Sequence, residues 1–453
     1  MPTHICIIGG GPGGNTCATV AAALGAEVTL VEREIVGGAA HLRDCVPSKA
    51  MIATGGELIE LRRARTMGLE ASGRLDLEAL RARVRRIEEH LHCGIVELLS
   101  SQGVRLVHGT ARLTGPRSVA IRVPEGGEEH LEADVVVLAT GSRPRIPDWA
   151  PVDGRRVLTT RQAYPPPEMP EHLCVVGSGV TGVEFTHMFR ALGAEVTLVV
   201  SRQQVLPGKD PEVAAVLETA FAERGVRLLK GARAVGIEVR DDGVTVACDD
   251  GRRVDATHAL LAVGSEPNSE DLGLDAAGLA TDERGCVPVD HNCRTAVPSV
   301  YAVGDLSGRL PLSSVAAMQG RKVAEHVMGL HVRPHRHLDY DKAASAIFTD
   351  PEVADVGLAE AEAHAAGRRT RVTKVPFATN AKALIDGDPR GFVKVISDPA
   401  TGTVLGGSIV GRHAAELISV IAVAVRNGLR VSDLAESLLV HPALAEALAE
   451  AAL

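Results

Sequence analysis

The sequence predicts an α/β protein in which two units of the same strand, turn, helix and strand type are followed by a C-terminal α+β domain. The first observation is a short strand, a glycine-rich turn and an alanine-rich helix at the N-terminus. The second is that Ala191–Val199 repeats Ala23–Val31 residue for residue, at a shift of 168 positions. The third is a final segment in which strand-like runs precede helices. A chain of 453 residues has room for about three such domains.

Composition and charge exclude several classes of function. Of the residues, 45% are hydrophobic and 23% are charged, as in soluble globular proteins. The most apolar stretch, Leu417–Val425, ends at Arg426, well short of the ~18 residues that a membrane helix needs. A net charge of −9 without a basic block would repel nucleic acid. We therefore expect no membrane span and no nucleic-acid partner.

The cysteines indicate the compartment. All eight are scattered, without a CxxC motif or metal-ligand spacing, which favours a reducing cytosol over a disulfide framework or a metal site. The first strand starts at about residue 4, so we expect no signal peptide. The sequence thus predicts a cytoplasmic protein without a bound metal.

The first unit has the residues of a dinucleotide site. A strand over 3–8 leads into a turn with the GxGxxG glycines Gly9, Gly11 and Gly14, then a helix to Leu24 and a strand over 27–31. Such glycines let the backbone approach a pyrophosphate at the helix N-terminus. Glu32, at the end of the second strand, can hydrogen-bond an adenosine ribose. Together these features predict a Rossmann-type dinucleotide-binding unit.

The second unit repeats this pattern with one difference. A strand over 173–176, a turn with Gly177, Gly179 and Gly182, and a strand over 195–200 predict a second dinucleotide site, and therefore two cofactors. Val200 stands where the first unit has Glu32, and Ser201 and Arg202 follow it. The missing acid and the nearby arginine are compatible with a cofactor that carries a 2′-phosphate. The alternative is that Arg202 is only an exposed loop residue.

The remaining elements connect these units. A helix is expected over 47–65, a charged helix over 75–101 and a buried strand over 133–138 that ends near Thr140 and Gly141. Proline-rich connectors lie at 144–151 and 165–170. A strand over 259–263 runs into Gly264, and a strand over 300–303 delivers Gly304 and Asp305 before a helix over 313–328.

The C-terminal segment begins after a stretch rich in proline and histidine at 331–337, which we interpret as the last boundary. Strands are expected over 391–396 and 404–410, and helices over 414–427 and 431–438. We predict four segments: 1–149 and 269–340 as the two parts of the first domain, 150–268 as the second domain, and 341–453 as the third.

The segment at 36–49 carries a resemblance to a known family. The lipoamide dehydrogenase and glutathione reductase family has the pattern Gly-Gly-x-Cys-x4-Cys-x-Pro-Ser-Lys there. The matching residues are Gly37, Gly38, Cys45, Pro47, Ser48 and Lys49. The first cysteine is replaced by Ala40. Because 347–354 and 356–357 also match the opening of that family's dimerisation domain, the chain resembles a class I pyridine nucleotide-disulfide oxidoreductase over nearly its whole length.

The resemblance assigns cofactors to the two units. It implies FAD in the first domain, NAD(P)H in the second and a homodimer formed through 341–453. From the comparison of Glu32 with Val200, we expect NADPH to be used at least comparably to NADH. The cofactor-binding residues that we predict are Gly9, Gly11, Gly14, Glu32, Lys49, Thr140, Gly141, Gly304 and Asp305 for FAD, and Gly177, Gly179, Gly182, Glu184, Ser201, Arg202 and Gly264 around the nicotinamide cofactor.

The resemblance also implies catalytic roles. Lys49 and Glu184 match an ion pair beside the reactive flavin nitrogen. His441 and Glu446 match an acid-base pair that reaches into the partner's active site, where Ala40 leaves the histidine without its usual thiolate. His441 therefore either protonates another acceptor or is only an interface histidine. Cys45 matches the cysteine near the flavin, whereas Cys93 is expected to be a buried helix cysteine without a role.

These features predict an FAD-dependent NAD(P)H oxidoreductase that has lost disulfide chemistry and reduces a small-molecule acceptor directly. Within the family, the alanine and the Asp-Cys-Val-Pro-Ser-Lys context resemble actinobacterial NAD(P)H:quinone reductase, so a quinone is the expected acceptor. One alternative is a soluble pyridine nucleotide transhydrogenase. Another, from a different class, is a non-enzymatic FAD-holding interaction protein. A single-cysteine peroxidase is disfavoured because such flavoproteins carry their cysteine in a different motif.

Overall fold

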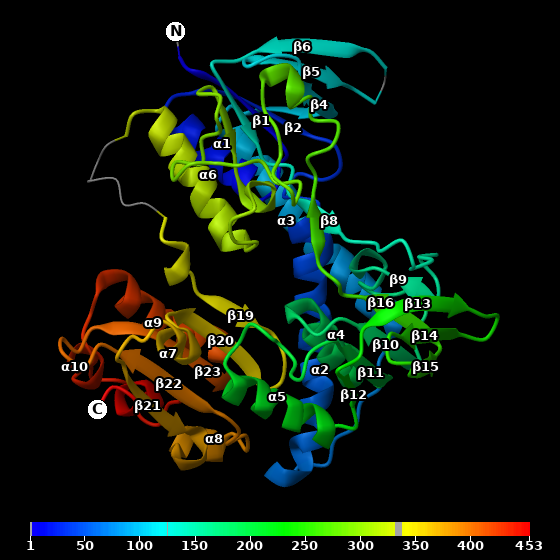
Figure 1. Ribbon diagram of the computed structural model, residues 1–453, viewed down its shortest axis with the longest axis vertical. Helices are drawn as coiled ribbons and strands as arrows, with labels where there is room; N and C mark the ends of the chain where they lie inside the picture. Colours follow the sequence, from blue (N-terminus) through cyan, green and yellow to red (C-terminus); the bar gives the residue numbers. More distant parts are fainter. Residues whose placement is uncertain (1, 125, 331–337) are drawn as a thin grey trace. The chain divides into compact units, whose positions relative to one another are not determined.

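The computed structural model describes residues 2–124, 126–330 and 338–453, so the boundary expected at 331–337 lies outside the described residues. The described chain forms two compact units (Figure 1). The first unit comprises Met1–Ser48, Arg81–Arg145 and Gly264–Tyr340, and the second comprises Lys49–Leu80, Ile146–Val263 and Asp341–Leu453. Each unit is therefore assembled from three separate segments of the sequence.

A five-stranded parallel sheet forms the core of the first unit. Its strand order is β18-β7-β1-β2-β3, with β1 (His4–Ile8) in the centre. The other strands are β2 (Glu27–Glu32), β3 (Arg105–His108), β7 (Val135–Leu138) and β18 (Val300–Ala302). Strands covered on both faces read as continuous apolar runs, and β1 and β7 do so. The carboxyl ends of these strands lead into the loops that carry the predicted FAD residues.

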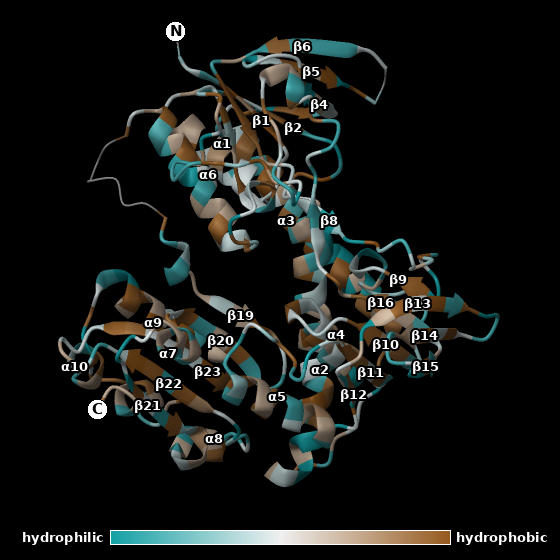
Figure 2. Cartoon of the chain, in the orientation of Figure 1, coloured by the Kyte–Doolittle hydropathy of each residue, from teal (hydrophilic) through white to brown (hydrophobic). Residues whose placement is uncertain are grey.

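Three helices and two small sheets complete the first unit. The helices are α1 (Pro12–Ala23), α3 (Leu77–Ser101), which begins just outside the unit, and α6 (Ser313–Val327). An antiparallel sheet is formed by β4 (Thr110–Leu113), β5 (Ser118–Arg122) and β6 (Glu128–Glu132). In Figure 2 β6 is drawn largely in the hydrophilic colour, whereas β1 and β2 are hydrophobic. A two-stranded ribbon pairs β8 (Ser142–Pro144) with β17 (Ser265–Pro267), so the two segments that follow the core strands are partners.

The second unit contains another parallel sheet of the same kind. Its order is β12-β11-β10-β16-β9, with β10 (His172–Val176) in the centre. The other strands are β9 (Val157–Leu158), β11 (Glu195–Val200), β12 (Arg227–Lys230) and β16 (His258–Leu261). An antiparallel sheet follows, made of β13 (Ala234–Val239), β14 (Val244–Cys248) and β15 (Arg253–Ala256). The helices of this part are α2 (Val46–Arg63), which begins just outside the unit, α4 (Val180–Leu192) and α5 (Pro211–Glu223).

The C-terminal part of the second unit is an antiparallel sheet with helices. Its order is β19-β20-β23-β22-β21, which comprises β19 (Ser345–Ile347), β20 (Glu352–Gly357), β21 (Arg371–Pro376), β22 (Phe392–Ser397) and β23 (Val404–Gly411). The helices are α7 (Glu360–Ala365), α8 (Ala381–Ile385), α9 (Ala414–Asn427), α10 (Val431–Ala435) and α11 (Glu446–Glu450). This arrangement is the α+β domain that the strand-then-helix order predicts.

One predicted helix is shorter than expected. We expected a helix over 431–438, but α10 ends at Ala435. The backbone N–H of Ser437 donates to the Leu434 carbonyl at 3.2 Å and not to that of Asp433, so the α-helical hydrogen-bond pattern has already ended there. Leu438 consequently lies beyond the helix and is fully exposed.

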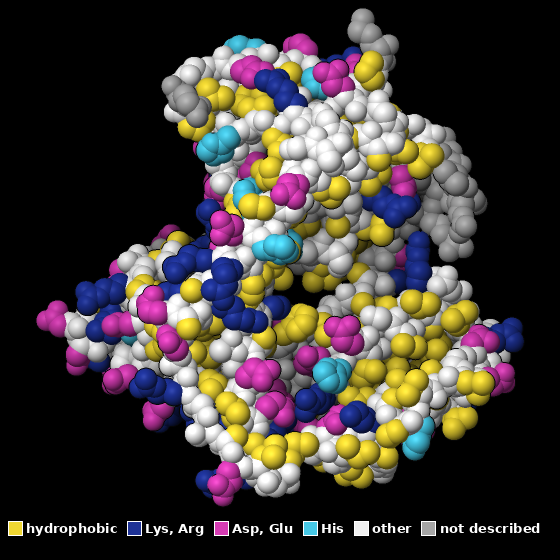
Figure 3. All heavy atoms as spheres, turned by 180° about the vertical axis from the view of Figure 1, so that it is seen from behind, with side chains coloured by type: hydrophobic (Ala, Val, Ile, Leu, Met, Phe, Trp, Pro, Cys, Tyr) yellow, Lys and Arg dark blue, Asp and Glu magenta, His cyan; other side chains and the backbone are white. Residues whose placement is uncertain are grey.

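Two surface findings bear on the expected partners. Among the residues that the structure describes, none of the helices combines the length and the apolar character needed to cross a bilayer. On the face shown in Figure 3, lysine and arginine side chains lie among aspartate and glutamate side chains and do not form one continuous basic surface.

Candidate active site

The first glycine turn is shaped by close backbone contacts. Gly9 has φ +105°, and a Cβ on it would lie 2.4 Å from the Ala139 carbonyl oxygen. A Cβ on Gly14 would lie 2.0 Å from the carbonyl oxygen of Gly9. In contrast, a Cβ on Gly11, which precedes α1, would meet only the Cα of Gly38, at 3.9 Å. The turn is thus closed on the protein side and open above the N-terminus of α1, as a bound pyrophosphate requires.

The carboxylate of Glu32 is fixed at the edge of this turn. Its Oε2 accepts the N–H of Gly10 at 2.7 Å, and its Oε1 accepts the N–H of Glu34 at 2.7 Å. The carboxylate therefore holds one orientation while each oxygen retains a lone pair. A ribose hydroxyl can donate to such an oxygen.

The second glycine turn repeats the first. Gly177 has φ +109°, and a Cβ on Gly182 would lie 1.8 Å from the Gly177 carbonyl oxygen. A Cβ on Gly179 would meet no atom within 4 Å. Neither α1 nor α4 has an acidic residue in its first turn or a side-chain N-cap bond, so both N-termini can receive an anion.

The end of β11 in the second glycine-turn unit differs from the corresponding end of β2 in the first. Val200 is fully buried, whereas Ser201 and Arg202 are exposed. The backbone carbonyl of Arg202 accepts the N–H of Gly231 at 3.1 Å, which fixes the main chain but leaves the side chain at the surface. Arg202 has no ion-pair partner in the part of the chain that the structure describes. Its guanidinium is consequently available to an anionic ligand.

The loops that carry the other predicted FAD residues are tied together by hydrogen bonds. The Thr140 hydroxyl donates to the Asn268 carbonyl at 2.7 Å, and the side-chain amide of Asn268 donates to the Thr140 carbonyl at 2.9 Å. The Ser142 hydroxyl donates to Asp305 at 2.6 Å. Gly141 and Gly304 both have positive φ, and Gly264 follows β16 at φ +100°. The structure therefore brings Thr140, Gly141 and Asp305 to one edge of the first parallel sheet.

The segment with Ala40 is a π-helix (Ala40–Cys45) that runs directly into α2. Before it, the N–H of Gly37 donates to the Gly10 carbonyl at 2.9 Å, and a Cβ on Gly38 would lie 2.5 Å from the Cα of Gly11. The segment is therefore packed on the first glycine turn, and only glycine fits at position 38. Ala40 itself is exposed. Single turns of π-helix are often found at functional sites.

The cysteines correct one prediction. We expected Cys93 to be buried, and that was wrong, because Cys93 is exposed on α3. The face of α3 that packs on the 36–37 segment carries His92, whose ring bonds the Val36 carbonyl at 2.9 Å, and Ile95. Cys93 lies between these two positions in sequence and therefore points away from the packed face. All eight cysteines are thiols, and Cys45 is half-buried.

Lys49 and Glu184 form an ion pair although they are 135 residues apart. The Lys49 ammonium on α2 lies 2.7 Å from Oε2 of Glu184 on α4. The Glu184 side chain is only 10% exposed and that of Lys49 is 31% exposed. The other oxygen of Glu184 accepts the backbone N–H of Phe348 at 2.9 Å. Both oxygens of a buried carboxylate are thus satisfied, which keeps a positive charge at one position.

His441 and Glu446 also form a pair. Nδ1 of His441 lies 2.7 Å from Oε1 of Glu446, whose other oxygen accepts the N–H of Ala443 at 2.9 Å. That backbone hydrogen bond, together with the bond to His441, lowers the pKa of Glu446. The His441 side chain is 73% exposed, so the second ring nitrogen is accessible from outside the subunit.

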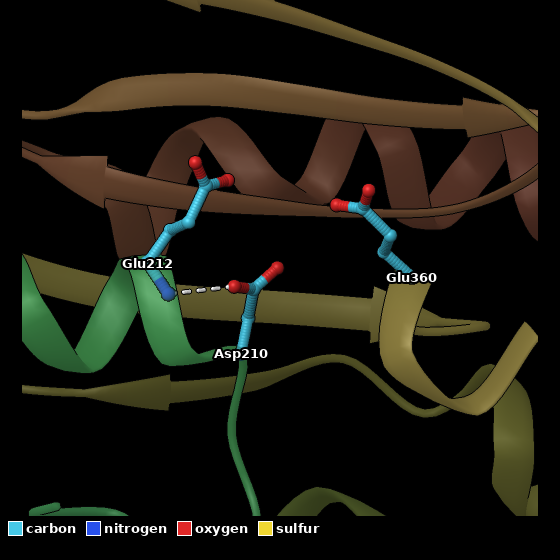
Figure 4. A group of neighbouring side chains, drawn as sticks. All are labelled: Asp210, Glu212 and Glu360. Carbon is cyan, nitrogen blue, oxygen red and sulfur yellow. Dashed lines mark hydrogen bonds between the residues drawn. The ribbon is translucent and has the colours of Figure 1, made fainter. Parts of the chain in front are cut away.

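A cluster of three carboxylates resembles a metal site but is occupied by a lysine. Oxygens of Asp210, Glu212 and Glu360 lie within 4.8 Å of one another, and Figure 4 shows the three side chains grouped beside the C-terminal sheet. The ammonium of buried Lys394 lies 2.6 to 2.7 Å from all three. Burial acts against the charge of Lys394, but the hydrogen bonds to the acids outweigh it and raise the pKa. The ammonium fills the position that a cation would need.

Several residues that support the site were not singled out from the sequence. Asn268 bonds Thr140 through its carbonyl and its side-chain amide, Gln319 accepts the N–H of Gly304 at 2.7 Å, and Phe348 holds Glu184. The bond from Phe348 to Glu184 uses a backbone N–H, which leaves no residue-type signal in a sequence. For Gln319, a buried amide in an otherwise apolar helix face was an available signal.

Comparisons with known proteins agree with this architecture. Residues 3–320 match the family model described as pyridine nucleotide-disulphide oxidoreductase, and residues 343–452 match its dimerisation domain. The chain is 42% identical to an NAD(P)H dehydrogenase (quinone) of Mycobacterium tuberculosis, over 100% of this chain and 94% of that protein. It is 37% identical to dihydrolipoyl dehydrogenase 2 of Haloarcula marismortui, over 99% of this chain and 96% of that protein.

Two solved structures share the fold of this chain. The crystal structure of LpdA from Mycobacterium tuberculosis has a TM-score of 0.94 at 41% identity and covers 99% of both chains. A structure of the HOCl-induced flavoprotein disulfide reductase of Escherichia coli has a TM-score of 0.88 at 24% identity, which shows the shared fold, over 99% of both chains. The chain thus belongs to the pyridine nucleotide-disulphide oxidoreductase family, whose members bind FAD and NAD(P)H.

Proposed function

We propose that this protein is an NAD(P)H oxidoreductase that delivers electrons through bound FAD to a quinone-type acceptor without a redox-active disulfide. Ala40 carries the proposal. It occupies the position of the first redox cysteine in the family pattern, which leaves Cys45 as the only sulfur in the π-helix. Because a dithiol-disulfide step requires two sulfurs, this segment cannot store an electron pair by that route.

The other site residues support such a reaction. FAD, when bound, supplies the electron transfer between the nicotinamide and the acceptor. The role that we propose for Lys49 and Glu184 is to hold a positive charge where negative charge develops during hydride transfer. A relative that is 42% identical is named NAD(P)H dehydrogenase (quinone), which favours a quinone over a disulfide as the acceptor.

The assembly and the nicotinamide preference are further parts of the proposal. The matched dimerisation domain and the exposed apolar side chains Val423 and Val440 favour a homodimer, in which His441 approaches the reactive segment of the other subunit. Exposed Arg202 favours use of NADPH. The eight cysteine thiols favour the cytoplasm. Sedimentation at micromolar concentration should give a dimer, and a monomer would contradict the assembly.

The acceptor is tested by steady-state turnover. Purified holoprotein with NADPH should reduce small benzoquinones or naphthoquinones but neither lipoamide nor glutathione disulfide. Oxidation of dihydrolipoamide to lipoamide with reduction of NAD+ to NADH, at a comparable rate, would refute the proposal. Exchange of hydride between NADPH and a thio-NAD analogue without any quinone would instead favour a transhydrogenase.

The ion pair is tested by a matched pair of variants. Lys49→Met should slow bleaching of the flavin absorbance by NADPH on the order of a hundredfold, because the fixed charge is lost. Lys382→Met removes an ion pair of the same 2.7 Å length, that with Asp386, from the C-terminal domain and should leave the bleaching rate unchanged. Equal rates for Lys49→Met and the wild type would remove Lys49 from the proposed chemistry.

A further inference from the structure

Phe348 contacts both members of the Lys49–Glu184 pair. Its backbone N–H donates to Oε1 of Glu184 at 2.9 Å, while the Lys49 ammonium lies 4.9 Å from the centre of its ring. Oε2 of the same carboxylate binds the ammonium at 2.7 Å. The three groups therefore form a closed set: the amide fixes the carboxylate, the carboxylate fixes the ammonium, and the ring covers the ammonium with its negative face.

The backbone of Phe348 is itself held by the two neighbouring positions. β19 ends at Ile347, where it pairs with Val353 of β20. Buried Thr349 donates its hydroxyl to the Pro351 carbonyl at 2.6 Å. These contacts place the Phe348 amide without any help from Glu184, so the amide is a fixed donor and not a mobile one.

Asp350 anchors the same segment through three arginines. It forms short ion pairs with Arg224 and Arg390, and Arg63 lies 3.3 Å away. Burial alone would raise the pKa of Asp350, but Arg224, Arg390 and Arg63 lower it to about 2. These arginines come from α2, from the residue that follows α5 and from the C-terminal domain. The segment that carries Phe348 is thus connected to three parts of the second unit.

Helices α2 and α4 meet with little space between them. A Cβ on Gly55 of α2 would lie 2.8 Å from the Cβ of Ala191 on α4, and Arg62 donates to the Ala191 carbonyl at 3.2 Å. Lys49 and Glu184 lie on these same two helices. A shift of either residue would have to move the closely packed helices, or break the contact with Phe348.

We propose that Phe348 is a positioning residue that sets the geometry of the Lys49–Glu184 pair, so that the C-terminal domain contributes to hydride transfer within its own chain. The amide prevents rotation of the Glu184 carboxylate, and the ring limits the positions of the ammonium. This inference rests on the proposed function for the role of the pair, but the contact that it postulates does not depend on the acceptor.

Substitutions of Phe348 distinguish an effect of its ring on flavin reduction from an effect on folding. Phe348→Leu keeps the amide and removes the ring, whereas Phe348→Tyr keeps both. Phe392 is the matched control, because its ring lies 5.5 Å from Lys374 and 5.8 Å from Lys394 in the same domain. The measured quantity is the rate at which NADPH bleaches the bound flavin, with the KM for NADPH recorded alongside.

We expect Phe348→Leu to slow bleaching by about threefold to thirtyfold, the range that one cation–π contact can carry, without a change in KM. Phe348→Tyr should restore the wild-type rate, and Phe392→Leu should retain it even where its melting temperature falls. Equal rates for Phe348→Leu and the wild type, or equal losses in Phe348→Leu and Phe392→Leu, would overturn the role of the ring.

Hydrogen exchange tests the contact without any turnover. In the Glu184→Ala holoprotein, peptides that cover 345–351 should exchange at Phe348 at least about tenfold faster than in the wild type, because the N–H loses its acceptor. Peptides over β22 should be unchanged. Unaltered exchange at 345–351 would refute the proposal. If wild-type flavin were not bleached by NADPH at all, the proposed function would fail while this measurement would still decide the contact.

Discussion

The two parallel-sheet units match in small details and differ at the ends of corresponding strands. His4 pairs with Glu27 in the first unit as His172 pairs with Glu195 in the second. The ring of His4 bonds the Thr29 hydroxyl at 3.1 Å, and the ring of His172 bonds the Thr197 hydroxyl at 2.9 Å. These shared contacts lie at the amino ends of the strands, away from the glycine turns.

The differences lie at the residues that we propose to bind the cofactors. Glu32, held by the Gly10 amide, corresponds to buried Val200, while Gly10 corresponds to Ser178. In the helices that follow the glycine turns, Thr16 of α1 corresponds to Glu184 of α4. This comparison supports our proposal that the repeated backbone supplies the phosphate cradle, and that a few substitutions at strand ends and in the first helix assign the chemistry.

The largest expected effect comes from the same substitution in both turns. In Gly14→Ala the new Cβ would meet the Gly9 carbonyl at 2.0 Å, and in Gly182→Ala it would meet the Gly177 carbonyl at 1.8 Å. Gly14→Ala should be purified without FAD. Gly182→Ala should retain FAD but lose bleaching by NADPH by more than about a hundredfold, because the pyrophosphate cradle is displaced.

Absorbance spectra and stopped-flow reduction distinguish these outcomes. As a control, Gly56→Ala adds a Cβ to a glycine of α2 that has no atom within 4 Å of the new group, and it should leave both readouts unchanged. If Gly182→Ala lost FAD and Gly14→Ala retained it, the assignment of cofactors to the two turns would be reversed.

A smaller effect concerns a buried base that only the second unit has. His187 corresponds to Thr19, and its burial, followed by the charge of Arg224, lowers its pKa from 6.5 to about 4. The unfolded chain takes up this proton at higher pH than the folded chain does, so the stabilisation is complete above pH 6.5 and is lost as the pH falls toward 4. The loss is roughly 2–3 kcal/mol.

Urea unfolding of the wild type and of His187→Gln between pH 7 and pH 4 measures this loss. Gln retains an acceptor for Arg224, which lies 3.2 Å from Nδ1 of His187, but does not titrate. The variant should therefore show a flatter pH profile. Parallel profiles would mean that His187 is not the group responsible.

The smallest expected effect is on cofactor choice. Arg202→Glu should lower kcat/KM for NADPH about tenfold more than for NADH, because a 2′-phosphate would then face a like charge. Arg369→Glu makes the same change of charge at an exposed arginine of the C-terminal domain and should affect neither cofactor selectively. Equal losses for NADPH and NADH in Arg202→Glu would remove Arg202 from the binding site.

The sequence predicted those parts of the fold that depend on residue type. The glycine turns require glycine at positions 9, 14, 177 and 182, and α9 covers the predicted range of 414–427. The small sheets at 110–132 and 234–256 were not predicted. In β6, leucine is the only apolar residue among three glutamates and a histidine, which gives little apolar signal.

The site was predictable to a similar degree. Lys49 and Glu184 were found because both lie in motifs, and the structure brings them within 2.7 Å. Phe348 was missed because its hydrogen bond uses the backbone, and Cys93 was misplaced because helix periodicity does not show which face of α3 is covered. The cysteine error matters chemically, because an exposed thiol on α3 is the most accessible one available as a partner for Cys45.

The central claim is that this chain stores electrons on FAD alone, and an anaerobic dithionite titration tests it most directly. The wild type should take up one electron pair per FAD, and Cys93→Ser should do the same. Ala40→Cys should take up two pairs, because a disulfide to Cys45 accepts two electrons and two protons when it is reduced to two thiols. Uptake of two pairs by the wild type would contradict the account, and a return to one pair in Cys93→Ser would then identify the second sulfur.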